Sequence, residues 1–220
     1  MEIKVHDRIL EANIRIAERN RELFKRRGVT VLNLIGGPGV GKTALLEASI
    51  PLLLRRFKVG VIEGDIYTSR DSERILALGV PVVQINTKGA CHLDGNMVES
   101  VLSDLPLDEL DMVLIENVGN LVCPAEFDVG EDAKIVVMSV ADGDDKPQKY
   151  PLIFRLAKAL VITKSDMLEL AGIDLDRLKG DALSVNPKLE VFLTSARKQK
   201  GLGAWVDFVA SLVRPSPKPA

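Results

Sequence analysis

The segment Gly36–Thr43 constrains this chain more than any other part of its sequence. It reads Gly36-Gly37-Pro38-Gly39-Val40-Gly41-Lys42-Thr43 and fits the phosphate-binding pattern G-x-x-x-x-G-K-[ST]. An apolar run at 29–35 precedes it and a helix-forming run at 44–48 follows it, which is the strand–loop–helix setting that such a loop needs. Backbone N–H groups of the loop converge on phosphate oxygens, Lys42 reaches the β- and γ-phosphates, and Thr43 offers its hydroxyl to Mg²⁺. All eight residues are therefore predicted to bind nucleotide.

Short apolar runs alternate with helix-forming stretches along the rest of the chain. The runs predict strands at 29–35, 58–63, 80–85, 111–116, 134–140, 158–163 and 189–194. Helices are predicted at 42–55, 70–78, 96–103, 165–170, 174–185 and 201–213. This alternation is typical of βαβ units. The predicted fold is therefore an α/β P-loop NTPase, with a mostly parallel sheet of about seven strands and helices on both faces.

The two ends of the chain differ from its centre. Val5, Ile9, Ala12, Ile16 and Leu23 recur at helical spacing, which predicts one amphipathic helix that ends near Gly28. We expect this helix, within residues 1–28, to pack on a P-loop domain at 29–213. The segment 214–220 holds three prolines and is expected to be a disordered tail.

The composition excludes several classes of protein. The 220 residues carry a net charge of −2, which does not favour nucleic acid or an anionic membrane as a partner. No apolar run reaches the roughly 20 residues of a membrane span, and the first residues lack the apolar core of a signal peptide. Two cysteines do not make a disulfide framework. These features favour the cytoplasm.

Acidic residues stand where two of the predicted strands end. Glu116 closes the run at 111–116 and is followed by Gly119, whose backbone N–H can approach a γ-phosphate. Asp65 closes an earlier strand and is a candidate for the Mg²⁺ shell or the attacking water. With Lys42 and Thr43, these two acids form the predicted catalytic set, and Thr43, Asp65 and Glu116 are the predicted magnesium ligands.

The segment Thr163-Lys164-Ser165-Asp166 predicts the identity of the base. GTP-binding proteins usually have Asn-Lys-x-Asp here, and the aspartate accepts hydrogen bonds from guanine that adenine does not offer. Lys164 would pack on the ring. Thr163 departs from the pattern, so we expect guanine selectivity to survive while affinity suffers. Ser195 and Ala196 match the loop that offers a backbone N–H to guanine O6.

Slow hydrolysis is expected. Asn120 stands where faster GTPases place a glutamine that orients water, and no arginine finger is identifiable, although Arg70 and Arg74 are candidates. The stretch Thr68–Arg74 resembles a mobile segment that opens a helix, and an ordinary helix start explains it equally well.

Two cysteines and a histidine form a separate candidate site. Cys91 and His92 are adjacent, and Cys123 follows Gly119 by four residues. Sulfur and imidazole ligands suit Zn²⁺ or Ni²⁺, and three ligands leave a position for exchange or for a second subunit. A γ-phosphate that orders the segment after Glu116 would also place Cys123. Buried apolar cysteines beside a surface histidine remain the alternative.

The chain resembles the HypB family, the nickel-incorporation GTPases of [NiFe]-hydrogenase maturation. The resembling segments are Gly36–Thr43, 63–65 with 71–74, 91–94, 116–126 and 143–151. The resemblance implies a P-loop GTPase that dimerises on binding GTP. It also implies that Cys91, His92 and Cys123 are interface ligands for nickel or zinc, and that GTP or GDP and Mg²⁺ are bound. The implied partners are a small nickel accessory protein of the HypA type and the hydrogenase large-subunit precursor.

Two departures from the family are visible. Relatives often carry a histidine shortly after the Cys-His pair, and Asn96 occupies that region here. Many bacterial relatives also carry an N-terminal Cys-x-x-Cys-Gly-Cys motif and a histidine-rich stretch, and this sequence has neither, like the short archaeal form. We therefore expect no nickel storage and no N-terminal high-affinity nickel site.

Three other interpretations stay open. A urease-accessory nickel GTPase would typically use a Cys-Pro-His motif, whereas the cysteine and histidine are adjacent here. An ATP-dependent small-molecule kinase would not explain the segment Thr163–Asp166. A zinc-linked structural dimer with a vestigial nucleotide site is disfavoured by the intact Lys42 and Thr43.

Overall fold

Seven parallel strands form the central sheet of this protein. The structure is a computed structural model and describes residues 3–65 and 70–215. The strands lie in the order β3-β2-β4-β1-β5-β6-β7. They are β1 Thr30–Ile35, β2 Val59–Asp65, β3 Val82–Asn86, β4 Met112–Glu116, β5 Ala133–Ser139, β6 Ala157–Thr163 and β7 Glu190–Leu193. Each predicted strand is present within a few residues of its expected bounds, and the predicted α/β fold is confirmed.

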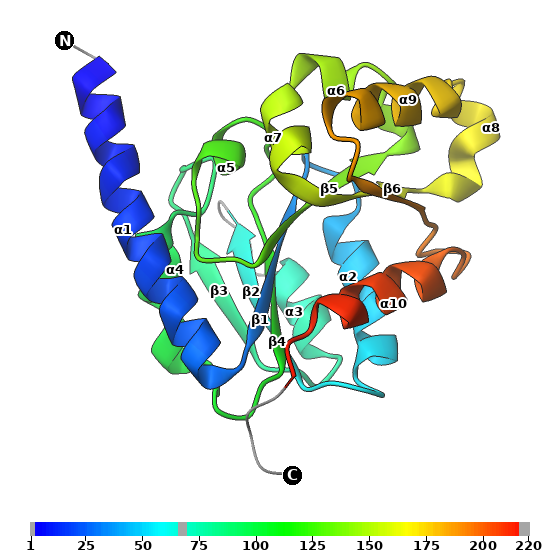
Figure 1. The fold of residues 1–220 in the computed structure, drawn as a ribbon. Helices are drawn as coiled ribbons and strands as arrows, with labels where there is room; N and C mark the ends of the chain where they lie inside the picture. Colours follow the sequence, from blue (N-terminus) through cyan, green and yellow to red (C-terminus); the bar gives the residue numbers. More distant parts are fainter. Residues whose placement is uncertain (1–2, 66–69, 216–220) are drawn as a thin grey trace.

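One face of the sheet is covered by α2 (Lys42–Leu53), α3 (Arg70–Leu76) and α10 (Leu202–Leu212). Their apolar side chains meet alternate residues of the strands, such as Leu32 and Leu34 of β1. Trp205 is the largest side chain in this core, and its ring N–H donates to Ser49 Oγ at 3.1 Å. Figure 1 shows α2 and α10 side by side against this face.

The opposite face carries two separate groups of helices (Figure 1). Over β3, β2 and β4 lie α1 (Ile3–Arg27), α4 (Gly95–Glu99) and the short 3₁₀ helix η1 (Leu102–Asp104). Over β5, β6 and β7 lie α5 (Cys123–Glu126), α7 (Pro151–Leu156) and α9 (Leu175–Val185). The remaining elements are η2 (Val140–Asp142), α6 (Lys146–Lys149), η3 (Ser165–Met167) and α8 (Leu168–Ala171).

The buried stripe of α1 differs from the predicted one. Asn13, Ala17, Asn20 and Phe24 are the buried residues, whereas Ile9 is 51% exposed. The two asparagines face loops whose backbone groups need partners. Asn13 accepts from Gly95 N at 2.7 Å and donates to Asp128 O at 2.8 Å, and Asn20 donates to Gly95 O at 2.8 Å. Buried backbone groups must be paired, so polar side chains occupy positions that the apolar pattern assigned to solvent.

Three short helices, α5, α6 and α7, were not predicted from the sequence. In α5, α6 and α7 a proline stands at the first or second helical position, where its missing N–H costs no hydrogen bond. Of the expected disordered tail at 214–220, the structure describes only the first two residues. Arg214 donates to Val29 O at 2.8 Å and pairs with Asp132, while residues 216–220 lie outside the described part. No helix among the described residues is long and apolar enough to cross a membrane.

The connections around β1 and β4 create the place for a ligand. The chain runs from β1 into α2 on one face, and from β4 into α5 on the other. Adjacent strands whose connections leave on opposite sides open a crevice at their carboxyl ends, where α/β proteins of this kind bind ligands.

Candidate nucleotide and metal sites

The phosphate loop places a lysine inside the mouth of the crevice. Gly41 has φ +95°, a left-handed conformation that favours glycine, and lets α2 begin directly after the loop. Lys42 is only 6% exposed, and its Nζ donates to the carbonyl oxygens of Gly36 and Gly37 at 3.3 and 3.4 Å. Such long contacts satisfy the ammonium group weakly, and phosphate oxygens would be stronger partners. Val40 is buried and lines neither of the two cavities of this site described below, and its carbonyl oxygen accepts from the Thr163 hydroxyl.

The predicted magnesium and catalytic residues lie around one cavity of about 470 Å³. It is lined by Lys42, Thr43, Asp65, Glu116 and Gly119, together with Pro38, Gly39, Gly41, Ala44, Glu63, Gly64, Arg74, Asn117 and Val118. The Thr43 hydroxyl donates to Glu116 Oε1 at 3.0 Å, and Lys42 Nζ lies 3.9 Å from the same oxygen. A hydroxyl and carboxylates in one cavity are the hard oxygen ligands that Mg²⁺ prefers.

Glu63 is a cavity residue that sequence reasoning missed. It is 2% exposed and lies beside Glu116, its register partner on the neighbouring strand. The prediction chose Asp65 because that residue closes the strand, and Asp65 does line the same cavity. Glu63 lies two residues before Asp65 on β2. Because side chains alternate along a strand, Glu63 and Asp65 point to the same side, and this spacing was the signal for Glu63.

Gly119 lies against the phosphate loop. A Cβ atom at this position would come within 2.9 Å of Cα and N of Pro38, so only glycine fits. Asn120 also forms an isolated bridge with Gly36. The segment that follows β4 therefore touches the loop expected to hold the phosphates.

A second cavity, of about 210 Å³, continues from the phosphate loop. It shares Gly41 and Ala44 with the first cavity and is lined further by Leu45, Thr163, Lys164, Asp166, Met167, Thr194, Ala196 and Arg197. Ser195 donates its hydroxyl to Asp166 Oδ1 at 2.5 Å, and this hydrogen bond lowers the pKa of Asp166 below its usual value. Asp166 is therefore ionised at neutral pH, which is the form that accepts hydrogen bonds from a base.

Thr163 ties the second cavity to the phosphate loop. Its hydroxyl lies 2.5 Å from Val40 O and 3.1 Å from Met138 O, and both are acceptors for its single proton. Lys164 has φ +57° and donates to Gly39 O at 2.7 Å. A non-glycine residue in this region is strained, and such strain occurs where the surroundings hold a functional side chain in place.

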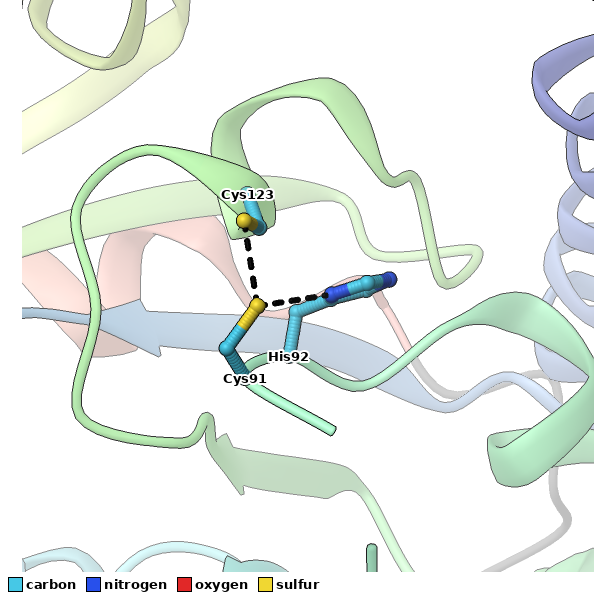
Figure 2. A group of neighbouring side chains, drawn as sticks. All are labelled: Cys91, His92 and Cys123. Carbon is cyan, nitrogen blue, oxygen red and sulfur yellow. Dashed lines mark hydrogen bonds between the residues drawn. The ribbon is translucent and has the colours of Figure 1, made fainter. Parts of the chain in front are cut away.

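The two cysteines and the histidine of the second candidate site come together (Figure 2). Their ligand atoms all lie within 4.8 Å of one another. Cys91 Sγ is 3.1 Å from Cys123 Sγ and 3.6 Å from His92 Nδ1, and these two contacts are the dashed lines in Figure 2. Cys91 is exposed, while the other two are half-buried. Among the described residues, this is the only group of three or more His, Cys, Asp or Glu side chains whose ligand atoms lie so close together.

The surroundings act in opposite directions on two of these candidate ligands, favouring the neutral imidazole of His92 and the protonated thiol of Cys123. The His92 ring packs on Phe127 with centroids 3.9 Å apart, and burial lowers the pKa of His92. The imidazole is therefore neutral near pH 7, as a metal ligand must be. Contact with the Cys91 thiol, and then burial, raises the pKa of Cys123, so metal would displace a proton from this thiol on binding.

The residues expected to govern the hydrolysis rate do not all face the phosphates. Asn120 accepts from Val122 N at 2.9 Å and donates to Cys91 O at 3.3 Å. Its side chain therefore faces the segment 87–95, which runs from the end of β3 to the start of α4 and carries Cys91 and His92; we call it the Cys-His loop. Arg74 lines the first cavity and pairs with Glu47 of α2. The expected switch segment Thr68–Arg74 falls partly outside the described residues, and the side chain of Arg70 with it. Asn96 lies exposed in the first turn of α4.

Comparison with known proteins identifies relatives along most of the chain. Residues 30–193 match the family described as CobW/HypB/UreG, nucleotide-binding domain. The hydrogenase maturation factor HypB of Escherichia coli K12 is 43% identical over 207 residues, which cover 94% of this chain and 71% of that protein. The probable hydrogenase maturation factor HypB of Methanocaldococcus jannaschii is 41% identical over 206 residues, which cover 94% of this chain and 93% of that protein.

Solved structures agree with these matches. HypB from Archaeoglobus fulgidus superposes with a TM-score of 0.86 at 38% identity, covering 92% of this chain and 98% of that one. HypB from Helicobacter pylori in complex with nickel superposes with a TM-score of 0.86 at 37% identity, covering 91% of this chain and 94% of that one. A LAO/AO transport system kinase superposes with a TM-score of 0.58 at 19% identity, which shows a common fold and nothing more.

Proposed function

The chain belongs to the HypB group of the CobW/HypB/UreG nucleotide-binding family, and on that premise we propose that it is a GTPase that delivers nickel to the large subunit of [NiFe]-hydrogenase. One observation carries this proposal. The segment that packs on the phosphate loop at Gly119 also bears Cys123, whose sulfur lies 3.1 Å from that of Cys91. A nucleotide site and a thiol–imidazole site are thus built on one short stretch of chain.

The nucleotide half of the proposal rests on the two joined cavities. Phosphates would lie in the cavity lined by Lys42, and guanine in the cavity lined by Asp166. Mg²⁺ would be held by Thr43, Asp65 and Glu116, and when bound it would neutralise charge that develops on the phosphates. Lys42 then leaves its loop carbonyls for phosphate oxygens, and Glu116 holds the Thr43 hydroxyl in place.

The metal half rests on the chemistry of the cluster. Cys91, His92 and Cys123 supply three ligands for Ni²⁺ or Zn²⁺. A partly exposed cluster with three ligands leaves room for the same cluster of a second copy, related by two-fold symmetry. We propose that GTP brings two copies together at this surface and that hydrolysis separates them and releases the metal. A HypA-type accessory protein would supply nickel, and the hydrogenase large-subunit precursor would receive it.

The test is the oligomeric state and metal content of the purified protein. Size-exclusion chromatography with light scattering and metal analysis would be run with GDP, then with a non-hydrolysable GTP analogue, each with Ni²⁺ or Zn²⁺. We expect the analogue to give a particle of twice the chain mass that carries metal, and GDP to give a monomer. A monomer without metal in both states would contradict the metal-delivery function and leave only a GTPase.

Guanine selectivity makes a separate prediction. Replacing Asp166 with asparagine removes the carboxylate that accepts from guanine and substitutes an amide that can donate to the additional oxygen of xanthine. We expect the preference for GDP over XDP to fall at least about tenfold, since one good hydrogen bond to a charged group is worth about 1.5–3 kcal/mol.

Competition binding with GDP, XDP and ADP measures this change. Asp176→Asn on α9 serves as the control, because it makes the same chemical change on an exposed helix face away from both cavities. An Asp166→Asn protein with unchanged base preference would show that the base does not lie in the second cavity.

A further inference from the structure

Asn117 occupies a buried position between the nucleotide cavity and the Cys-His loop. It directly follows the carboxyl end of β4 and is 1% exposed. Its Oδ1 accepts two backbone hydrogen bonds, from Val118 N at 3.0 Å and from Leu93 N at 3.1 Å. Val118 directly precedes Gly119, and Leu93 directly follows His92. One side-chain oxygen therefore joins the segment that packs on the phosphate loop to the segment that carries two candidate metal ligands.

The orientation of the Asn117 amide is fixed by its partners. Because Val118 N and Leu93 N are both donors, only the oxygen can face them. The nitrogen then points into the sheet and donates to Asn33 Oδ1 at 3.1 Å. Asn33 lies in the middle of β1, is fully buried, and its Nδ2 has no hydrogen-bond partner among the described residues. An incompletely satisfied amide in the core is unfavourable for stability, so this pair is better explained by a function than by packing.

Leu93 joins the same loop to a second strand end. Its side chain is fully buried and lies so close to Gly64 that a Cβ there would be 2.8 Å from Leu93 Cδ1. Gly64 stands between Glu63 and Asp65, which line the nucleotide cavity. The Cys-His loop is thus seated on the ends of β2 and β4, by packing on the first and by a hydrogen bond to the second.

We propose that Asn117 is a positioning residue that couples the nucleotide state to metal affinity. When Gly119 moves toward a γ-phosphate, Asn117 Oδ1 carries that movement to Leu93 N and so to the adjacent ligands Cys91 and His92. Two other contacts join the segments. The hydrogen bond from Asn120 Nδ2 to Cys91 O is longer at 3.3 Å and solvent-exposed, and the contact between Cys91 Sγ and Cys123 Sγ lies within the candidate metal site itself. This inference rests on the proposed function, because it assigns the regulation of the same metal site.

The far end of the Cys-His loop is held independently of the nucleotide cavity. Gly95 N donates to Asn13 Oδ1 at 2.7 Å, and Asn13 belongs to α1, which contributes no residue to the cavity. Asn13 is also a buried asparagine that accepts from a backbone N–H of this loop. It is therefore a matched control, since its loss loosens the same loop without touching β4.

The experiment measures Ni²⁺ affinity in two nucleotide states. The dissociation constant is determined with GDP and with a non-hydrolysable GTP analogue for the wild type, Asn117→Ala and Asn13→Ala. The ratio of the two constants is the coupling factor, which for coupled sites is typically about 5–150. We expect Asn117→Ala to bring the ratio to near one, and Asn13→Ala to keep the wild-type ratio even where its absolute affinity falls.

Each outcome separates this inference from the proposed function. A wild-type ratio above one that Asn117→Ala leaves unchanged would overturn the role of Asn117 and leave nucleotide gating intact. A wild-type ratio of one would overturn the gating and the inference together. A uniform loss of affinity in both nucleotide states of Asn117→Ala does not change the ratio, and so counts against the proposal.

Amide hydrogen exchange on the wild type tests the same point if Asn117→Ala fails to fold. The Leu93 amide, bound to Asn117, is expected to change its protection at least severalfold between GDP and the GTP analogue. The Gly95 amide, bound to Asn13, is expected to keep its protection. Equal Leu93 exchange in the two nucleotide states would overturn the proposal.

Discussion

Lys42→Ala is expected to abolish nucleotide binding and hydrolysis. The Lys42 side chain is almost fully buried at the mouth of the phosphate cavity, where its ammonium makes long contacts with loop carbonyls and lies 3.9 Å from Glu116 Oε1. Removing one partner of a buried charge pair costs about 2–5 kcal/mol, so we expect GDP and GTP affinity to fall by more than about a hundredfold. Hydrolysis should fall from an unassisted rate on the order of 10⁻⁴ to 10⁻² s⁻¹ to background.

Titration calorimetry with GDP and a GTP analogue, and phosphate release under single-turnover conditions, measure these losses. Lys188→Ala is the control, because Lys188 is an exposed lysine before β7, outside both cavities. Binding of the analogue by Lys42→Ala at wild-type affinity would mean that the loop at 36–43 does not hold phosphates. A wild-type rate above about 1 s⁻¹ would contradict the expectation of slow turnover.

The strands and the phosphate loop could be predicted from the sequence because their signals are local. A buried parallel strand is a short apolar run, and a loop that cradles phosphate needs glycines and a lysine at fixed spacing. The short helices α5, α6 and α7 could not be predicted in this way. Each spans six residues or fewer and begins beside a proline, so its stability comes from packing rather than from helical periodicity.

The buried asparagines mark the limit of sequence reasoning. The pattern of apolar and polar residues along the sequence predicts that Asn13, Asn20 and Asn117 face solvent. In the structure, the exposed fraction of each is at most 6%. Their burial is set by loops far away in sequence that bring backbone N–H and C=O groups against them. A local signal was Asn33, a polar residue with apolar neighbours on both sides within β1.

Cys123→Ala is expected to remove the metal and to spare GTP hydrolysis. The Cys123 sulfur lies 3.1 Å from that of Cys91, and Cys123 does not line the nucleotide cavity. Losses at residues that only orient a ligand typically cost 10- to 100-fold in metal affinity, so the loss of a thiolate ligand should cost at least about a hundredfold. The single-turnover hydrolysis rate without metal should stay within about twofold of the wild type.

The effect of Cys123→Ala must be separated from a disturbance of α5, which Cys123 begins. Val122→Ala is the matched control, since Val122 is the preceding residue, is 53% exposed, and carries no ligand atom. Val122→Ala should therefore bind Ni²⁺ and Zn²⁺ like the wild type, while Cys123→Ala loses both in equilibrium dialysis with metal analysis. Stoichiometric metal retained by Cys123→Ala would rule out Cys123 as a ligand. If Cys123→Ala bound no metal but also lost hydrolysis, Cys123 would instead support the nucleotide cavity through the segment that begins at Gly119.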